Sequence, residues 1–170
     1  SAVLEGIKMA LKTEYTDIII EMDADLSHDP SELKSKIEIF LNNDCDLLIS
    51  SRYMNKSLII GWPISRKFLS FLSNKLAKLF LKVPISDYTN GYRFYSKNAA
   101  RHVTLNCGNI GDGFIVLSEI LLELYLNKFK LFETDTIFRN RIRGSSTVNL
   151  QLIINSFIGL LKLYLIKIKR

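Results

Sequence analysis

The amino-acid sequence predicts an α/β fold, and three observations lead to this prediction. Amphipathic helical segments alternate with short apolar strands from the start of the chain. The first strand is rich in isoleucine on both faces, which is typical of a strand buried in a parallel sheet. The chain has 170 residues, of which 48% are hydrophobic and 24% charged, so it is long enough for one core but not for two.

The first half of the chain has the predicted order helix, strand, helix, strand. Apolar residues at helical spacing predict a helix over about residues 2–12, and the run Asp17–Met22 predicts the first strand. Asp29 as N-cap and Pro30 at the first helical position predict where the second helix begins. A second apolar strand follows at Asp46–Ser50. The apolar face of the second helix comprises Leu33, Ile37, Phe40 and Leu41.

The second half continues the alternation. A long helix follows Pro63, and its apolar stripe comprises Phe68, Leu69, Leu72, Leu76, Leu79 and Phe80. The remaining predicted elements are a turn and short strand at Asp87–Tyr95, a helix at Phe114–Leu126, a strand at Lys130–Phe138 and a basic loop at 139–147. From about Val148 the chain is again helical and very apolar.

Charge and cysteine content narrow the classes of function. Lysine and arginine exceed aspartate and glutamate by 23 − 17 = +6, which favours nucleic acid, anionic lipid or a phosphorylated small molecule as partner. Cys45 and Cys107 have no CxxC spacing, so we expect reduced thiols in an intracellular protein. The sequence contains no run of about 18 or more apolar residues, so we expect no membrane span. An amphipathic pattern follows Ser1 directly, so we expect that the natural N-terminus lies further upstream.

Asp23 and Asp25 follow the first strand and are two residues apart. In extended backbone, side chains at i and i+2 point the same way, so both carboxylates can face one point. Two converging carboxylates suit a hard divalent cation, since Mg²⁺ or Mn²⁺ is held by few carboxylates together with substrate phosphates. The alternative is one capping and one solvated aspartate. His28 is a further candidate ligand, although a cap or loop histidine fits the position better.

A series of short segments can be compared with known families. They are Glu21–Pro30 (EMDADLSHDP), Ser51-Arg52-Tyr53, Gly61-Trp62-Pro63 with Arg66, Ser70 and Asn74, Asp87–Arg93 (DYTNGYR), Gly113-Phe114 leading to Glu119, and Phe138–Ser146 (FRNRIRGSS). This series resembles glycosyltransferase family 2, and within it the polyprenol-phosphate (dolichol-phosphate) mannose synthases. The resemblance covers about residues 1–150, and the segments occur in the family's order.

The resemblance implies a GT-A fold, a Rossmann-like nucleotide-diphospho-sugar transferase arranged as a three-layer sandwich, here missing its first strand or strands. Residues 1–148 would form the partial catalytic domain and residues 149–170 an amphipathic basic helix. The chain departs from the family at Leu117, where many members carry glutamine, and at Thr147, where lysine is common. Ser27 stands where relatives sometimes carry a glutamine that binds metal.

The resemblance also implies a reaction. A hexose, mannose from GDP-mannose above all, would move to the phosphate of a polyprenol or dolichol monophosphate with inversion, assisted by Mg²⁺ or Mn²⁺. Asp23, Asp25 and Ser27 would hold the metal. Asp23 and Asp25, with Asp87 and Glu119, would bind the donor.

Arginines are implied at the acceptor phosphate, because a guanidinium can bind two phosphate oxygens at once. Arg52, Arg66 and Arg141 match the family's acceptor-phosphate arginines, and Ser70 its hydroxyl donor. The catalytic residues would be these three arginines together with Asp25. A solvated surface position is the alternative for each arginine. For Asp87 and Glu119 the alternative is an internal ion pair, for example Asp87 with Arg93.

The implied partners are a nucleotide sugar, a polyprenyl phosphate and a membrane surface, with no nucleic acid; the sequence does not indicate a protein partner. The C-terminal helix has a wide apolar face and ends in Lys167, Lys169 and Arg170. Such a helix can lie in a lipid interface or pack on the catalytic domain. We therefore expect a cytoplasmic protein bound peripherally to the cytoplasmic face of a membrane.

Three alternative functions remain open from the sequence. Asp23-Ala24-Asp25-Leu26-Ser27 also resembles the nucleophile loop of haloacid-dehalogenase-like phosphatases, but their later acidic motif would need an acid where this chain has Val116. A sibling transferase could use UDP-glucose or another nucleotide sugar with the same acceptor. A truncated, non-catalytic domain could bind lipid or a protein partner.

Overall fold

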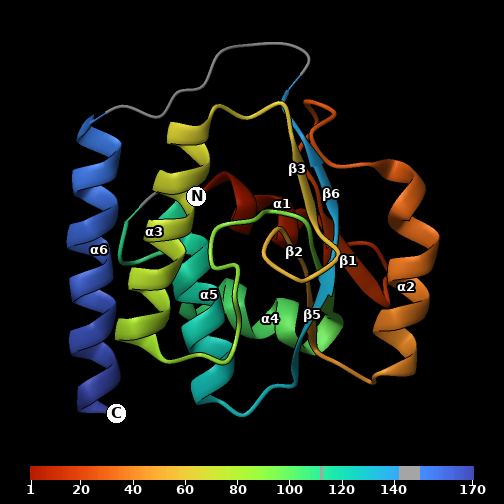
Figure 1. Ribbon diagram of the computed structural model, residues 1–170. Helices are drawn as coiled ribbons and strands as arrows, with labels where there is room; N and C mark the ends of the chain where they lie inside the picture. Colours follow the sequence, from red (N-terminus) through yellow and green to blue (C-terminus); the bar gives the residue numbers. More distant parts are fainter. Residues whose placement is uncertain (112, 142–149) are drawn as a thin grey trace.

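The fold is built around a four-stranded mixed sheet in a computed structural model that describes residues 1–111, 113–141 and 150–170 (Figure 1). The strands lie in the order β1 (Ile18–Glu21), β4 (Arg93–Ser96), β2 (Leu47–Ser51) and β5 (Leu131–Asp135). β4 is antiparallel to β1 and β2, and β2 is parallel to β5. β1, β2 and β5 therefore run in one direction, and their carboxyl ends meet at the same edge.

Helices cover both faces of the sheet and give three layers (Figure 1). Alternate residues of β2 point to opposite faces: Leu47 and Ile49 join the larger core, and Leu48 joins the smaller one. The larger core lies under α1 (Ala2–Ala10), α4 (Lys97–Asn106) and α5 (Phe114–Leu126), and the smaller under α2 (Leu33–Asn42), which a short 3₁₀ turn at Pro30–Glu32 precedes. The predicted α/β alternation is confirmed.

The surroundings of the first strand differ from the prediction. β1 pairs antiparallel with β4, and Ile20 is 36% exposed, so the prediction of a parallel strand buried on both faces is wrong. Within the described residues β1 has one partner strand. The run of isoleucines indicates that the strand is apolar. Whether the strand is parallel or antiparallel to its neighbour depends on β4, which lies more than 70 residues away along the chain. On α2, Leu41 is exposed and Lys36 is buried, contrary to the predicted face.

Two outer helices, α3 (Ile64–Leu81) and α6 (Leu150–Lys169), lie side by side, and α6 also packs on α5 (Figure 1). The predicted stripe of α3 is mostly not a core face, because α3 buries Asn74, Ala77 and Leu81. We call the apolar side chains that these two helices leave exposed the outer apolar face. It comprises Ile64, Phe68, Leu69, Phe71, Leu72 and Leu79 of α3, and Ile153, Ile154, Phe157, Ile158, Leu161, Leu165 and Ile168 of α6.

We expected no membrane span from the sequence, and helix α6 differs from that expectation. By length and composition, Gln151–Lys169 could cross a membrane, and 17% of its apolar window is buried in the structure. The side that packs on the domain includes Leu160 and Leu163. The proposed domain boundary at residues 148 and 149 lies outside the described residues.

Three further details were missed by the sequence prediction. The expected strand Lys130–Phe138 is two strands, because β5 ends at Asp135 and β6 (Ile137–Arg139) pairs with β3 (Leu58–Ile60) in a second sheet. Neither β3 nor α4 was predicted. The basic loop at 139–147 is described only as far as Arg141.

Candidate functional site

The acidic loop leaves the carboxyl end of β1 and folds back on itself. Asp25 Oδ1 accepts hydrogen bonds from the Ser27 backbone N–H at 3.0 Å and the Ser27 hydroxyl at 2.6 Å. Partial burial acts to raise the pKa of Asp25, but the Ser27 hydrogen bonds and the charge of Arg141 outweigh it and lower the pKa. Leu26 adopts a left-handed conformation at φ 65°, which a non-glycine residue rarely takes. This loop thus holds Asp25 in its charged form.

The donor set of this loop fits a divalent cation that takes further ligands from a substrate. The Asp23 side chain is 54% exposed and Asp25 has one oxygen, Oδ2, that faces Arg141 Nε at 3.6 Å. No cluster of three or more acidic, histidine or cysteine side chains suited to a metal occurs among the described residues. Two carboxylates suffice for Mg²⁺ when phosphates supply the rest. The Ser27 hydroxyl is directed at Asp25, so its ligand role stays a prediction.

Arg52 follows β2 and forms a buried ion pair with Asp87. Arg52 Nε and its NH2 group donate to Asp87 at 2.8 and 2.7 Å, and the Arg52 backbone N–H donates at 2.9 Å. The backbone N–H groups of Thr89 and Asn90 donate to the same carboxylate. Burial acts to raise the pKa of Asp87, but the Arg52 charge and these hydrogen bonds outweigh it and hold the pKa below its usual range.

Asp87 is therefore placed differently from the sequence prediction. Its five donors exceed the roughly four lone-pair positions of a carboxylate, which leaves little capacity for a sugar hydroxyl. The structure favours a role in positioning Arg52. The alternative of an internal ion pair is confirmed for Asp87, but the partner is Arg52. Arg93 is not the partner, because its buried guanidinium donates to the carbonyl oxygens of Asn90, Leu117 and Tyr88.

The structure brings the three predicted arginines together. Arg66 lies on the first turn of α3 with its guanidinium 4.0 Å from the centroid of the Trp62 ring, and Arg52 lies 5.5 Å from the same centroid. Desolvation lowers the pKa of Arg66, and the neighbouring charges of Arg141 and Arg52 lower it further. Arg141 reaches the loop of Asp25 because the backbone N–H of Arg139 donates to the Ser27 carbonyl at 2.9 Å. The result is a cluster of three guanidinium groups beside the acidic loop, which we call the arginine cluster.

Ser70 lies one turn after Arg66 on α3, as its spacing predicts. Its Oγ accepts a hydrogen bond from the Tyr53 hydroxyl at 2.7 Å. Asn74 continues the same face: its amide donates to the Ser70 carbonyl and to the hydroxyl of Thr89, which also accepts from Arg52. Ser70 thus belongs to a hydrogen-bonded network around Arg52.

Glu119 lies apart from this cluster. Its carboxylate accepts from the backbone N–H groups of Gly108 at 3.0 Å and Asn109 at 3.4 Å, in the connection between α4 and α5. Burial raises the pKa of Glu119 against these hydrogen bonds. The described residues give Glu119 no contact with the acidic loop or the arginines, so its predicted donor-binding role gains no support. Val116, where a phosphatase would need an acid, is fully buried in the apolar core.

Sequence reasoning missed or undervalued three residues of the site. Trp62 lies under two arginines, and its indole N–H is buried without a hydrogen-bond partner in the part of the chain that the structure describes. His28 and Asn90 are almost completely buried and bonded to each other at 3.0 Å. The Gly-Trp-Pro and Asp-Tyr-Thr-Asn-Gly segments carried the signal, but only folding brings them together.

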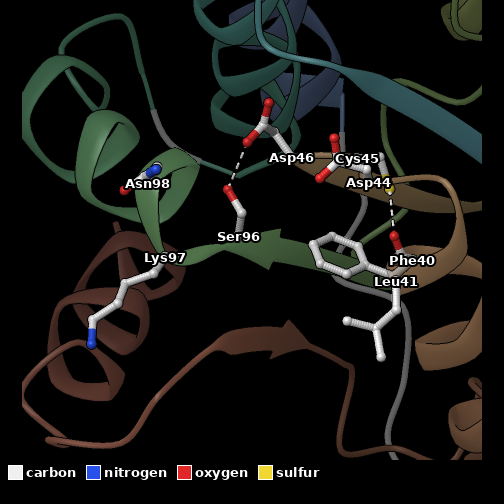
Figure 2. A pocket seen from close by; sticks show the side chains of 8 residues that line it. All are labelled: Phe40, Leu41, Asp44, Cys45, Asp46, Ser96, Lys97 and Asn98. Atoms are coloured by element: carbon white, nitrogen blue, oxygen red, sulfur yellow. Dashed lines mark hydrogen bonds between the residues drawn. The ribbon is translucent and has the colours of Figure 1, made fainter.

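A separate pocket of about 290 Å³ lies at the opposite edge of the sheet (Figure 2). Asp46, just before β2, accepts from the Ser96 hydroxyl at 2.9 Å and from the Lys130 backbone N–H at 3.0 Å. Both of its carboxylate oxygens are thereby engaged. The pocket is lined by Phe40, Leu41, Asp44, Cys45, Asp46, Ser96, Lys97 and Asn98. It is remote from the acidic loop, which lies at the carboxyl ends of β1 and β2.

Comparisons with known proteins show which family this chain belongs to. Residues 1–104 match the family model described as glycosyl transferase family 2. The chain is 30% identical over 149 residues to polyprenol monophosphomannose synthase of Mycolicibacterium smegmatis, which covers 88% of this chain and 55% of that protein. It is 34% identical over 116 residues to undecaprenyl-phosphate mannosyltransferase of Micrococcus luteus, covering 68% of this chain and 46% of that protein. The chain spans about half the length of these curated relatives.

Proposed function

We propose that this chain, which belongs to glycosyl transferase family 2, carries the catalytic centre of an enzyme that transfers a hexose to the phosphate of a polyprenol. The observation that carries the proposal is the convergence of Arg52, Arg66 and Arg141 beside Asp25 at the carboxyl ends of β1 and β2. Ligands of open α/β sheets bind at this edge. The names of the two relatives support a polyprenyl phosphate acceptor and a mannosyl group.

The arginines suit an acceptor phosphate. A phosphate monoester has a second pKa of about 6, so at neutral pH it is largely a dianion and can attack the sugar without a strong general base. Bringing that dianion to a nucleotide diphosphate requires positive charge. Arg66 and Arg141, which are partly exposed, supply it from the surface, and Arg52, held by Asp87, supplies it from the buried side.

The carboxylates suit the donor. Asp23 and Asp25, with Ser27 as a third candidate ligand, would hold Mg²⁺ or Mn²⁺, which when bound offsets charge on the departing nucleoside diphosphate. Direct attack by the lipid phosphate on the far side of the sugar gives inversion. We propose GDP-mannose as the donor, and a sibling reaction with UDP-glucose is the second outcome that a donor panel would detect.

The outer apolar face supports a membrane-bound acceptor. It begins on α3 beside Arg66, and Phe68 and Leu72 continue it along the helix with 65% and 42% of their side chains exposed. Exposed lysines flank it, among them Lys67 and Lys75 on α3 and Lys162 on α6. Apolar side chains flanked by cations bind anionic lipid surfaces. We propose that the cytoplasmic leaflet contacts this face and delivers the lipid phosphate to the arginines.

A transfer assay with the complete natural protein tests this function. Labelled GDP-mannose, UDP-glucose and other nucleotide sugars are each incubated with a short polyprenyl phosphate or with the matching free polyprenol. The proposal expects label in the lipid phase only with the phosphate and most with GDP-mannose. Asp25→Ala should abolish transfer, and the exposed Asp44→Ala should not. Equal labelling of the free alcohol, or full activity of Asp25→Ala, would refute the assignment.

A further inference from the structure

A buried chain of hydrogen bonds joins the acidic loop to Arg52 of the arginine cluster. The Asp23 backbone N–H donates to His28 Nδ1 at 3.1 Å. His28 Nε2 lies 3.0 Å from Asn90 Oδ1, and the Asn90 backbone N–H donates to Asp87 at 3.1 Å. Asp87 in turn binds Arg52. His28, Asn90 and Asp87 are each no more than 1% exposed, so water does not compete for these bonds.

The donors and acceptors of this chain fix one arrangement. A backbone N–H can only donate, so His28 Nδ1 must accept and the ring proton lies on Nε2. Asn90 Oδ1 therefore accepts from His28, which orients the Asn90 amide nitrogen toward the Ser50 carbonyl of β2 at 2.5 Å. Both ring nitrogens of His28 are thus engaged by protein groups. A metal-ligand role for His28 does not fit this arrangement.

Packing holds the imidazole in the plane that these bonds require. The His28 ring stacks on Tyr92 at 5.0 Å between centroids and meets the edge of Phe138 at 5.2 Å. Tyr92 belongs to the turn that enters β4, and Phe138 belongs to β6, which leads to Arg141. The acidic loop, the end of β2, the Asp87 loop and β6 therefore each touch His28 or its hydrogen-bond partner.

We propose that His28 and Asn90 are positioning residues that hold the backbone of Asp23 in register with the Asp87–Arg52 pair. This inference rests on the proposed function, because the register matters only if the acidic loop and the arginine cluster serve one reaction. Neither residue touches a substrate. Their effect is to fix the direction of the Asp23 carboxylate relative to β2, as groups behind a metal ligand commonly do.

Binding of Mn²⁺ tests the inference without relying on turnover. The free Mn²⁺ signal in electron paramagnetic resonance gives the Mn²⁺ affinity of the complete protein in the presence of GDP. His28→Ala should weaken this affinity by about 10–100-fold, the usual effect of removing an outer partner of a ligand. Asn90→Ala should weaken it in the same direction. The double variant should be no weaker than His28→Ala, since both changes break one connection.

Matched variants separate positioning from loss of fold. His102→Ala, at the other histidine, which pairs with Glu123 on α5, should leave the Mn²⁺ affinity unchanged. His28→Gln can accept from Asp23 and donate to Asn90, so it should recover part of the affinity and keeps the test available if His28→Ala does not fold. A His28→Ala protein that melts above the assay temperature and binds Mn²⁺ within about twofold of the wild type would overturn the inference. Wild-type protein that binds no Mn²⁺ with GDP would instead overturn the proposed metal site, and this inference with it.

Discussion

Replacing Asp87 by asparagine tests the buried ion pair on which the position of Arg52 depends. The side chain keeps its shape, but the charge opposite a guanidinium that is 6% exposed disappears. Breaking a buried pair by removing one partner costs about 3–5 kcal/mol, because the remaining charge stays desolvated. The three hydrogen bonds from Arg52 become weaker. At least two N–H donors also face the new amide NH₂ group, because Oδ2 accepts from two donors and Oδ1 from three. We expect the free energy of unfolding to fall by about 4 kcal/mol.

Urea unfolding followed by circular dichroism measures this change. With a slope of about 2 kcal/mol per molar urea, the midpoint should fall by about 2 M. Asp44→Asn makes the same chemical change in the exposed pair with Lys130 and should leave the midpoint unchanged. A midpoint for Asp87→Asn equal to that of the wild type would show that the pair does not hold Arg52 in place.

The same pair makes stability depend on pH in a definite direction. The folded pKa of Asp87 lies below its unfolded value of about 3.9, so the folded state favours the ionised carboxylate. Its contribution to stability is complete above the unfolded pKa and is lost as the pH falls through the folded pKa. Between about pH 5 and the folded pKa, Asp87→Asn should therefore lose less stability than the wild type. Parallel acid profiles of the two proteins would contradict this reasoning.

Three further predictions concern the arginine cluster and the outer apolar face. Arg141→Ala should raise the KM for a short polyprenyl phosphate by about tenfold or more, since a charge-assisted hydrogen bond contributes about 1.5–3 kcal/mol. The KM for the nucleotide sugar should change far less. Equal effects on both substrates would refute the acceptor assignment. Trp62→Leu should raise the acceptor KM more than Trp62→Phe, which keeps an aromatic face for Arg66, and identical kinetics of the two variants would show that the ring face is unimportant. Phe157→Ser should reduce sedimentation with anionic vesicles, whereas Leu105→Ser, at an exposed leucine of α4 outside that face, should not; an equal loss in both would remove the membrane role of the face.

The parts of the fold that depend on local chemistry could be predicted from the sequence. Asp29 and Pro30 begin the turn before α2 as expected, because capping is decided within a few residues. The strand direction at Ile18–Glu21 could not be predicted, because β4 joins it from a distant part of the chain. Helix α4 was not predicted, because its buried residues are the small Ala99, Ala100 and Val103, which give a weak apolar pattern.

The candidate site, like the fold, could be predicted from the sequence only in part. The positions of Asp25, Arg52, Arg66 and Arg141 followed from motifs in a shared order, and folding does bring them together. Local sequence could not reveal that Asp87 is saturated, because three of its five donors belong to Arg52, which lies 35 residues away along the chain. The apolar stripe of α3 had the correct period, but whether such a stripe faces a core or an outer surface depends on what packs beside it.

The proposal that Asp23, Asp25 and the three arginines form one reaction site is tested most directly by a crystal structure of the complete protein with Mn²⁺, GDP and a short polyprenyl phosphate. We predict anomalous Mn²⁺ density at Asp23 and Asp25, and the lipid phosphate within hydrogen-bond distance of Arg66 and Arg141. Mn²⁺ bound elsewhere, or a lipid phosphate that contacts none of the three arginines, would contradict it.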